Sequence, residues 1–322
     1  MVSKETIKQN LNNCLDDTSV IGLPGRKKGK VRDTYDLGDK LLLITTDRQS
    51  AFDRILASIP FKGQVLNQVS AFWFEETRDI VQNHILEIPD PNVTVAKKCS
   101  VLPIEFVVRG YLTGSTDTSS WTQYAKGIRD LCGNIVPDNM VKNQKFDKPI
   151  LTPTTKSDLH DESISARQII DRGIIDEQLW KQCESIAFKL FERGMQIAAQ
   201  HGLILVDTKY ELGLDANGAV MLIDEIHTPD SSRYWLSSTY EERLVQGKEP
   251  ENIDKEFLRL WFKDHCDPYN DAVLPDAPEE LVVELSSRYI SLYEMITGRQ
   301  FEIDTTLPLK DRLKKNLKAY GA

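Results

Sequence analysis

The most regular pattern in the chain is an apolar stripe that recurs every three or four residues over 177–200. This spacing places apolar side chains on one face of a helix, so the pattern predicts an amphipathic helix there. Asp176 can cap its start and Gly202 can end it. Weaker patterns of the same period predict further helices over 64–82, 254–263, 278–297 (ended by Gly298) and 308–319.

Shorter apolar runs between these helices predict strands. Segments 30–36 and 40–46 form a predicted hairpin joined by a turn at 37–39. Further strands are predicted over 93–96, 104–112, 203–212 and 219–226. Because strands and helices alternate unevenly, the pattern favours an α+β fold over a regular doubly wound sheet.

Composition narrows the class of protein. The 322 residues suffice for two domains, and 40% apolar with 28% charged residues is typical of a packed globular protein. The net charge of −9 disfavours a non-specific nucleic-acid or membrane surface. The N-terminal segment lacks the pattern of a signal peptide, and we therefore expect a cytoplasmic location. Five scattered cysteines without a Cys-x-x-Cys motif argue against a disulfide framework or a zinc site.

The predicted hairpin at 203–226 is the most informative segment. Asn217-Gly218 between two apolar runs is a strong hairpin signal, and a two-residue turn there places Glu211 opposite Asp224. A four-residue turn over 215–218 would instead place Lys209 opposite Asp224. Either turn puts four polar side chains on one face of the hairpin: Asp207, Lys209, Glu211 and Asp224. Only a shift of the strand register by one residue would separate them.

Two carboxylates that face each other repel unless a cation lies between them. Carboxylates together with waters and substrate phosphates form the usual magnesium site, so Glu211 and Asp224 are candidate Mg²⁺ ligands. Lys209 could neutralise a phosphate or the carboxylates. The alternative interpretation is a solvated polar face with an ordinary Lys–Glu pair.

A glycine-punctuated basic loop at 25–33 enters the first predicted hairpin. Its amides and its Lys and Arg side chains could hold phosphates, as a glycine-rich loop does in kinases. The segment is neither a Walker A motif nor a complete G-x-G-x-x-G, so a solvated basic turn is the alternative.

Two other clusters suit an anionic ligand. Arg109-Gly-Tyr-Leu-Thr-Gly-Ser115 places an arginine at the end of an apolar strand, with hydroxyls in a glycine-rich turn. Asp230-Ser-Ser-Arg233 follows the second hairpin directly. Either cluster could instead be only a capped turn. The histidine spacing argues against a histidine metal site, and no Gly-x-Ser-x-Gly motif of a serine hydrolase occurs.

Taken together, these motifs resemble the SAICAR synthetase (phosphoribosylaminoimidazole-succinocarboxamide synthase) family over nearly the whole chain. The segments that carry the resemblance are 29–33, 47–53, 109–115, 207–213 and 223–233. The resemblance implies a two-domain α+β fold, related to ATP-grasp enzymes and protein kinases, with antiparallel sheets and flanking helices. We expect a β-rich ATP-binding domain at 1–105 and a larger domain with the magnesium and substrate site at 106–322.

The same resemblance implies an ATP-dependent ligase of purine biosynthesis. It would join 5-amino-1-(5-phosphoribosyl)imidazole-4-carboxylate to L-aspartate and release ADP and phosphate. ATP is the implied co-substrate and Mg²⁺ the implied metal. The implied partners are these small molecules, with no nucleic acid and no membrane, in a monomer or small homo-oligomer.

Site residues follow from the resemblance, position by position. The implied ATP site contains Gly29, Lys30, Val31 and Arg32, with Glu105 near the adenine-side hinge. The implied metal ligands are Glu211 and Asp224. The implied catalytic residues are Lys209, near phosphate, and Arg233. The implied substrate contacts are Ser50, Asp53, Arg109, Ser115, Lys156, Asp230 and Arg233.

Two other functions remain open from the sequence. A kinase-like phosphotransferase would share the glycine-rich loop and the acidic pair, although no His-Arg-Asp or Asp-Phe-Gly motif of a protein kinase occurs. A non-catalytic nucleotide-binding regulator could also use this fold, but it would not need Lys209, Glu211 and Asp224 together.

Overall fold

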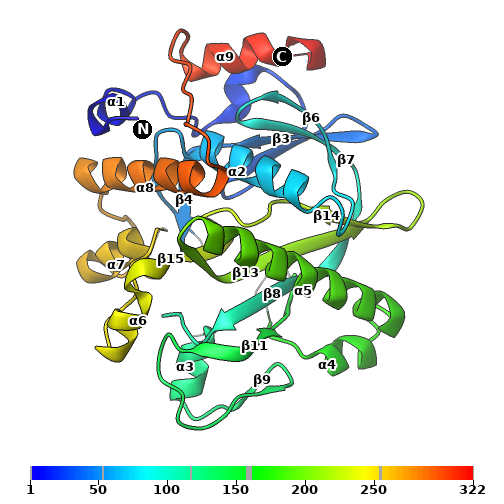
Figure 1. The fold of residues 1–322 in the computed structure, drawn as a ribbon. Helices are drawn as coiled ribbons and strands as arrows, with labels where there is room; N and C mark the ends of the chain where they lie inside the picture. The colour runs from blue at the N-terminus through cyan, green and yellow to red at the C-terminus, as the bar shows by residue number, and fades with distance from the viewer. Residues whose placement is uncertain (1, 53, 117, 157–161, 254–255, 322) are drawn as a thin grey trace. The chain divides into compact units, whose positions relative to one another are not determined.

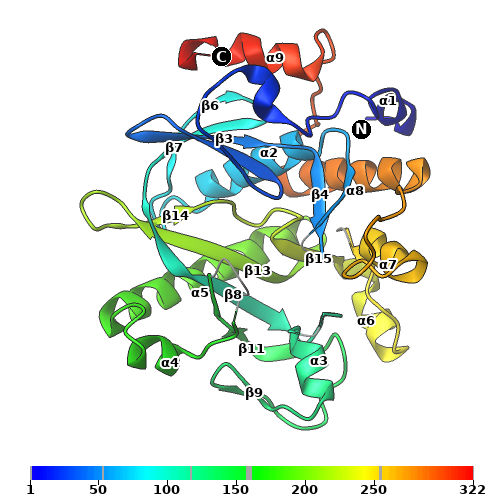
Figure 2. The same ribbon diagram turned by 180° about the vertical axis from the view of Figure 1, so that it is seen from behind.

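The computed structural model describes residues 2–52, 54–116, 118–156, 162–253 and 256–321. The chain forms two compact units (Figures 1 and 2). Unit 1 comprises Met1–Phe72, His84–Lys98 and Ile253–Ala322, and unit 2 comprises Trp73–Asn83 and Cys99–Asn252. This division differs from the one expected from the sequence. The chain enters the main part of unit 2 at Cys99, and the C-terminal segment belongs to unit 1.

Unit 1 is built on a five-stranded antiparallel sheet with the order β1-β2-β3-β7-β6. Its strands are β1 (Arg26–Lys28), β2 (Arg32–Asp36), β3 (Lys40–Thr45), β6 (Ile85–Asp90) and β7 (Val93–Lys97). A separate hairpin pairs β4 (Arg48–Ala51) with β5 (Arg54–Ser58). The helices are α1 (Lys4–Gln9), α7 (Glu256–His265), α8 (Glu279–Thr297) and α9 (Leu309–Asn316), with short 3₁₀ helices at Thr18–Ile21 and Lys318–Tyr320. Helix α2 (Lys62–Glu76) begins in unit 1 and ends in unit 2.

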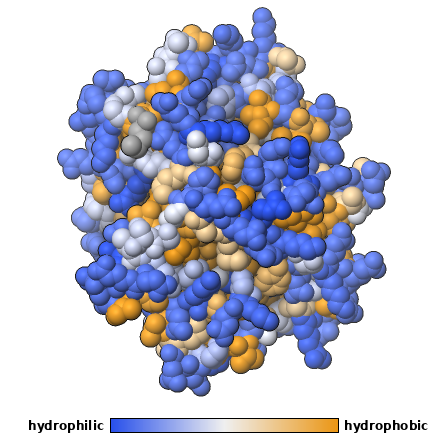
Figure 3. All heavy atoms as spheres, viewed as in Figure 1, coloured by the Kyte–Doolittle hydropathy of each residue, from blue (hydrophilic) through white to orange (hydrophobic). Residues whose placement is uncertain are grey.

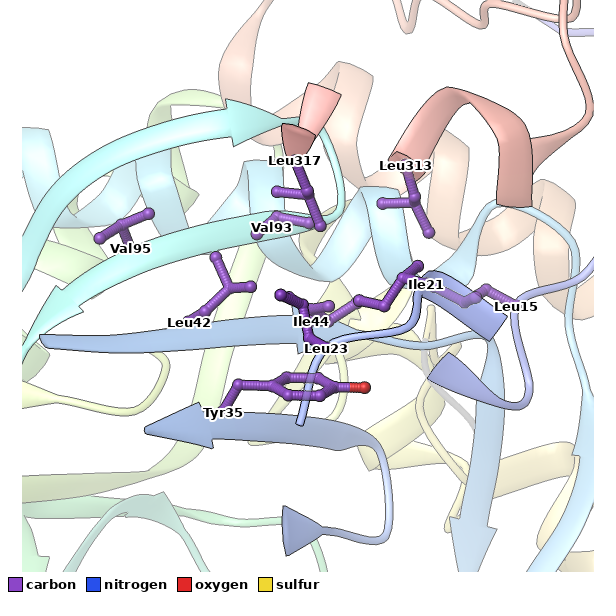
Figure 4. Close-up of a cluster of buried hydrophobic side chains, with 10 residues drawn as sticks. All are labelled: Leu15, Ile21, Leu23, Tyr35, Leu42, Ile44, Val93, Val95, Leu313 and Leu317. Atoms are coloured by element: carbon purple, nitrogen blue, oxygen red, sulfur yellow. The ribbon is translucent and has the colours of Figure 1, made fainter. Parts of the chain in front are cut away.

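The core of unit 1 explains why the C-terminal segment belongs to it. Leu313 and Leu317 extend from the end of the chain toward the strands, where they join buried side chains such as Ile44 and Val93 (Figure 4). The buried Arg312 of α9 also pairs with Asp90 of β6. Burying these leucines removes apolar surface from water, which favours docking of α9 on the sheet. This tertiary contact leaves no signal in the local pattern of the sequence.

Unit 2 contains a six-stranded sheet with the order β11-β8-β13-β14, in which β12 also pairs with β8 and β15 with β13. Its strands are β8 (Ser100–Tyr111), β11 (Lys145–Leu151), β12 (Thr154–Thr155), β13 (Leu203–Leu214), β14 (Val220–Ile223) and β15 (Ser232–Leu236). A small hairpin pairs β9 (Asp130–Leu131) with β10 (Asn134–Ile135). The helices are α3 (Ser120–Ala125), α4 (Ala166–Asp171), α5 (Glu177–Gln200) and α6 (Ser237–Val245).

Helix α5 covers one face of this sheet (Figures 1 and 2). Its start is capped by Asp176, as predicted, and the ring of Trp180 stacks on Phe106 of β8 with the centroids 5.6 Å apart. Because side chains alternate along a strand, the neighbours of Phe106 in β8 face the opposite side of the sheet. That opposite face carries the polar residues described below.

The surface is polar over most of the face drawn in Figure 3, with apolar residues gathered in patches between the polar ones. No helix within the described ranges combines the length and the apolar character needed to cross a membrane.

Candidate active site

A row of three charged side chains crosses adjacent strands of unit 2. Asp207 on β13 is paired in register with Arg109 on β8 and with Arg233 on β15. Its Oδ2 atom lies 3.4 Å from Nη1 of Arg109 and 3.3 Å from Nη1 of Arg233. One buried carboxylate therefore holds two guanidinium groups side by side, with a net positive charge left for an anionic ligand. The sequence predicted both arginines but not their common partner.

Arg109 is held in place by further contacts. Its Nε donates a hydrogen bond of 2.8 Å to Oγ1 of Thr152. Burial lowers the pKa of Arg109. The positive charge of Arg233 lowers this pKa further, whereas the negative charge of Asp207 raises it. Arg109 also lines a cavity of about 210 Å³ together with hydroxyl-bearing side chains that include Ser120, Thr152 and Thr154. This combination of a positive charge and hydroxyl donors suits a small anionic group.

A second group of charges continues along the same face. Glu211 on β13 lies opposite Glu105 on β8, and Lys209 pairs with both: its Nζ is 3.1 Å from Oε1 of Glu105 and also contacts Oε1 of Glu211. Lys156, which follows β12, contacts the other oxygen of Glu211. Oγ1 of Thr154 donates a hydrogen bond of 3.0 Å to Glu105. Lys209 thus bridges two carboxylates that would otherwise repel each other, and Lys156 adds a second positive charge beside Glu211.

The charge of Lys209 is stabilised by these neighbours. Burial alone would lower the pKa of Lys209, but Glu211, Asp224 and Glu105 outweigh burial and raise it well above its usual range. Lys209 is therefore a permanent cation, suited to neutralising a phosphate and unsuited to acting as a base. The contribution of Asp224 also shows that its carboxylate lies within electrostatic reach of Lys209.

The predicted register of the β13–β14 hairpin is wrong by one residue. Ile223, not Asp224, lies opposite Glu211, because the connection has five residues between Leu214 and Val220. Asp224 follows the end of β14 and has a left-handed backbone with φ of 65°. Alternation no longer fixes the direction of its side chain at this point, and despite the slip its charge still raises the pKa of Lys209.

The loop after Asp224 is anchored by a buried histidine that the sequence analysis did not single out. Nε2 of His227 lies 2.6 Å from the hydroxyl of Tyr210, and its ring meets Trp73 edge-on at 4.6 Å between centroids. A Cβ atom at Gly194 of α5 would lie 2.5 Å from Cε1 of His227, so the helix needs a glycine there. Tyr234 donates a hydrogen bond of 2.7 Å to the carbonyl of His227.

Burial lowers the pKa of His227 to about 3 from a usual 6.5. The folded protein therefore binds fewer protons than the unfolded chain between these values, and stability is lost as the pH falls below 6.5. This contribution amounts to about 1.4 kcal/mol for each pH unit. When the pH falls from 6.5 to 5, the free energy of unfolding of the wild type should decrease through protonation of His227. The His227→Gln variant lacks this group, so its decrease should be about 2 kcal/mol smaller. Urea unfolding at both pH values checks this, and equal losses in the two proteins would contradict it.

Other predicted site residues of unit 2 occupy loops at the ends of strands. Ser115 is exposed in the turn after β8, and Asp230 is partly buried in the turn before β15, where its amide donates to Thr228. In unit 1, Ser50 is buried in β4, and Asp53 lies outside the described residues. Glu105 was expected near the hinge between the domains. The chain passes into the main part of unit 2 six residues earlier, at Cys99, and the side chain of Glu105 pairs with Lys209. That residues around Glu105 contact adenine stays a prediction.

The predicted glycine-rich loop is a tight turn between β1 and β2 in unit 1. The amide of Gly29 donates to the carbonyl of Arg32, with 3.1 Å between the two atoms. A Cβ atom at Gly29 would lie 2.3 Å from that carbonyl oxygen, so any larger residue would force the turn open. The basic loop of the sequence analysis therefore has a defined backbone shape, as a phosphate-binding turn requires.

The carboxylates of unit 2 fit a metal ion bound partly by its substrate. Within the described ranges, no three His, Cys, Asp or Glu side chains gather closely enough to hold a metal by themselves. Mg²⁺ usually takes only one or two protein carboxylates and completes its shell with waters and phosphates. Glu211 and Asp224 both lie near Lys209, and this oxygen donor set suits Mg²⁺.

Comparisons with known proteins show the family to which the chain belongs. A profile of the SAICAR synthetase family matches residues 26–275. A phosphoribosylaminoimidazole-succinocarboxamide synthase of Legionella pneumophila (strain Paris) is 62% identical over 310 residues, which cover 95% of this chain and 98% of the relative.

Solved structures show the same similarity. The SAICAR synthase of Saccharomyces cerevisiae complexed with SAICAR has a TM-score of 0.75 at 32% identity, over 86% of this chain and 95% of that chain. A SAICAR synthetase (Type-2) in complex with ADP has a TM-score of 0.66 at 26% identity, over 86% of this chain and 100% of that chain.

The fold, the charged sheet face and these relatives define an ATP-dependent ligase. The chain belongs to the SAICAR synthetase family, as its motifs indicated. It is an enzyme of purine biosynthesis that joins an imidazole carboxylate nucleotide to an amino acid through ATP.

Proposed function

We propose that the charged face of the six-stranded sheet is where 5-amino-1-(5-phosphoribosyl)imidazole-4-carboxylate is joined to L-aspartate. The observation that carries this proposal is the row of Arg109, Asp207 and Arg233 beside the cluster around Lys209. The two arginines of the row can bind the anionic groups of a nucleotide. In the cluster, the cation Lys209 lies between carboxylates and can neutralise a phosphate during its transfer.

The reaction needs two steps because a carboxylate is a poor electrophile. An oxygen of the imidazole carboxylate attacks the γ-phosphorus of ATP, the bond to ADP breaks and an acyl phosphate forms. The neutral amine of aspartate then attacks the acyl carbon, phosphate leaves and the amine loses a proton as the amide forms. Both steps develop charge on phosphate oxygens, so catalysis consists mainly of positioning and charge neutralisation.

The positively charged groups on the sheet face each have a role in this scheme. Lys209, a permanent cation, neutralises the phosphoryl group during its transfer and departure. Arg109 and Arg233 bind the phosphate and carboxylate of the imidazole nucleotide, with Ser115 and Asp230 in the turns beside them. Lys156, which pairs with Glu211, is free to move toward a substrate anion when a metal takes up the charge of that carboxylate.

In unit 1, we assign the ATP phosphates to the turn formed by Gly29, Lys30, Val31 and Arg32. Its fixed backbone and its positive side chains support this assignment. Ser50 and Asp53 would border the substrates. The relation of this fold to ATP-grasp enzymes and protein kinases, the cytoplasmic location, the absence of nucleic-acid and membrane partners, and a monomeric or small homo-oligomeric state all stay predictions.

We assign Mg²⁺ to Glu211 and Asp224, where it would neutralise the phosphate oxygens of ATP when bound. Asp224→Asn should lower kcat at least about tenfold and raise the Mg²⁺ concentration that gives half-maximal rate. A Mg²⁺ titration of ADP release measures both effects. Asp171→Asn, at an exposed position of α4, is the control and should leave the titration unchanged. An unaltered Mg²⁺ dependence in Asp224→Asn would remove Asp224 from the metal site.

The proposed reaction is tested by following the product itself. With isotopically labelled aspartate, the label should enter the succinocarboxamide nucleotide in a one-to-one ratio with the ADP released. ADP release without transfer of the label would show that the chemistry ends at phosphorylation and would contradict the proposal.

A further inference from the structure

We infer that Arg48 is a positioning residue for the nucleotide, because its buried guanidinium fixes the backbone of the Gly29–Arg32 turn from inside unit 1. This inference rests on the proposed role of that turn in binding ATP phosphates. Arg48 itself would touch neither ATP nor the reacting atoms.

The guanidinium of Arg48 is almost entirely buried, with 1% of the residue exposed. Its Nη2 donates a hydrogen bond of 3.0 Å to the carbonyl of Gly29, and its Nε donates one of 3.1 Å to the carbonyl of Lys30. Its Nη1 donates a third, of 2.8 Å, to the carbonyl of Asp16. A planar fork of donors that satisfies several carbonyls at fixed angles is a property of arginine that lysine does not share.

Asp33, the first residue beyond the turn, balances the charge of Arg48. Its side chain is fully buried, pairs with Nη2 of Arg48 and accepts a hydrogen bond of 2.6 Å from Oγ1 of Thr18. It also accepts a bond of 3.3 Å from the amide of Gly29. A buried ion pair is tolerated when its remaining donors and acceptors are satisfied, as they are here. The pair therefore links the turn to the interior of the unit.

With the contacts of Arg48, every carbonyl oxygen of the turn accepts a hydrogen bond within the protein, which favours the binding of an anion. The carbonyls of Gly29 and Lys30 accept from Arg48, that of Val31 accepts from the amide of Thr46, and that of Arg32 accepts from the amide of Gly29. All four carbonyl oxygens of the turn are thus occupied inside the protein. These carbonyl oxygens, which would repel a phosphate, therefore point toward their own hydrogen-bond donors. A turn of this kind can bind an anion without changing its conformation.

Arg48 is itself held by the buried end of a neighbouring lysine. Its carbonyl accepts a hydrogen bond of 3.0 Å from Nζ of Lys62, a residue of α2 that is also fully buried. Hydrogen bonds therefore connect α2 through β4 to the turn, and Arg48 is suited to fixing the turn in one conformation before ATP arrives.

The test compares Arg48→Lys with Arg312→Lys. Arg312 is a matched control because it is also buried in unit 1, with 7% of the residue exposed, and makes hydrogen bonds to Asp90 and Asn92 but none to the turn. We expect Arg48→Lys to raise the Kd for ADP and the KM for ATP at least about tenfold, with the KM for aspartate unchanged. Arg312→Lys should leave all three constants close to those of the wild type. Unchanged ADP affinity in folded Arg48→Lys would overturn the inference.

Two further variants make every outcome decisive. Gly29→Ala opens the turn directly, so unchanged ADP affinity in this variant would show that the turn does not bind the nucleotide and that the proposed role of the turn fails. Weakened binding in Gly29→Ala with normal binding in Arg48→Lys would overturn only the role of Arg48. If Arg48→Lys does not fold, as judged by circular dichroism, Asp33→Asn carries the same test, since it removes the charge that holds Arg48.

Discussion

Replacing Lys209 with glutamine is expected to lower kcat about 100- to 1000-fold, the usual cost of removing one preorganised group that stabilises charge in a transition state. Lys209 is the cation between Glu105 and Glu211, and Asp224 also raises its pKa. Glutamine removes the positive charge that lies between the two carboxylates, so this charge no longer neutralises the transferred phosphoryl group. The rate of ADP release with all three substrates at saturation measures the effect.

The control for this experiment is Lys181→Gln on α5, where the lysine is exposed and pairs with Glu177 one turn away. That variant should keep the turnover of the wild type, because exposed pairs of this kind contribute little. Thermal unfolding of Lys209→Gln separates loss of catalysis from loss of fold. A folded Lys209→Gln protein with turnover near that of the wild type would remove Lys209 from the reaction.

Replacing Arg233 with alanine is expected to lower kcat/KM for the imidazole nucleotide at least about tenfold. A hydrogen bond to a charged group contributes about 1.5–3 kcal/mol, which corresponds to a factor of roughly 10 to 150. Arg233 lies beside Arg109 across Asp207, so the variant also leaves Arg109 more tightly paired with that carboxylate. Initial rates over a range of nucleotide concentrations, at saturating ATP and aspartate, measure the change.

Arg167→Ala is the matched control, because Arg167 is exposed on α4 and pairs with Asp171 of the same helix. Arg109→Lys adds a second check. A lysine cannot both donate to Thr152 and pair with Asp207 in the way that Arg109 does, so this variant should keep only part of the activity of the wild type. Unchanged nucleotide kinetics in Arg233→Ala would mean that this residue only caps the turn that precedes β15.

Elements with a strong local signal were predicted well from the sequence. Helix α5 begins after Asp176 as expected, and α8 ends at Gly298, which has a left-handed backbone with φ of 65°. The hairpin of β2 and β3 is also confirmed. In each case a cap, a glycine or an apolar period within the element itself determines the structure, and tertiary contacts do not override it.

Elements that depend on distant contacts were not predicted. Strand β15 was not predicted, since its residues become a strand only by pairing with β13. The C-terminal helix α9 was expected in the second domain, and its leucines instead pack on the sheet of unit 1. The short helices α3, α4 and α6 are too brief to produce a periodic apolar stripe.

The site shows the limit of reasoning from alternation. The shared face of Asp207, Lys209 and Glu211 was predicted, because all three lie within β13. The register with Asp224 was not, since the carboxylate of Asp215 accepts hydrogen bonds from the amides of Asn217 and Ala219 and stabilises a longer connection. The partners Asp207 and Glu105 became visible only when β8, β13 and β15 were placed side by side.

The most direct test of the central claim is the release of ADP with each substrate omitted in turn. A ligase that activates the imidazole carboxylate and passes it to an amine should release ADP at full rate only when ATP, the imidazole nucleotide and L-aspartate are all present. The account predicts that omission of either the nucleotide or aspartate reduces steady ADP release to background. Sustained release with the nucleotide alone would indicate a phosphotransferase, and no release with all three present would indicate a nucleotide-binding regulator; either result would contradict the account.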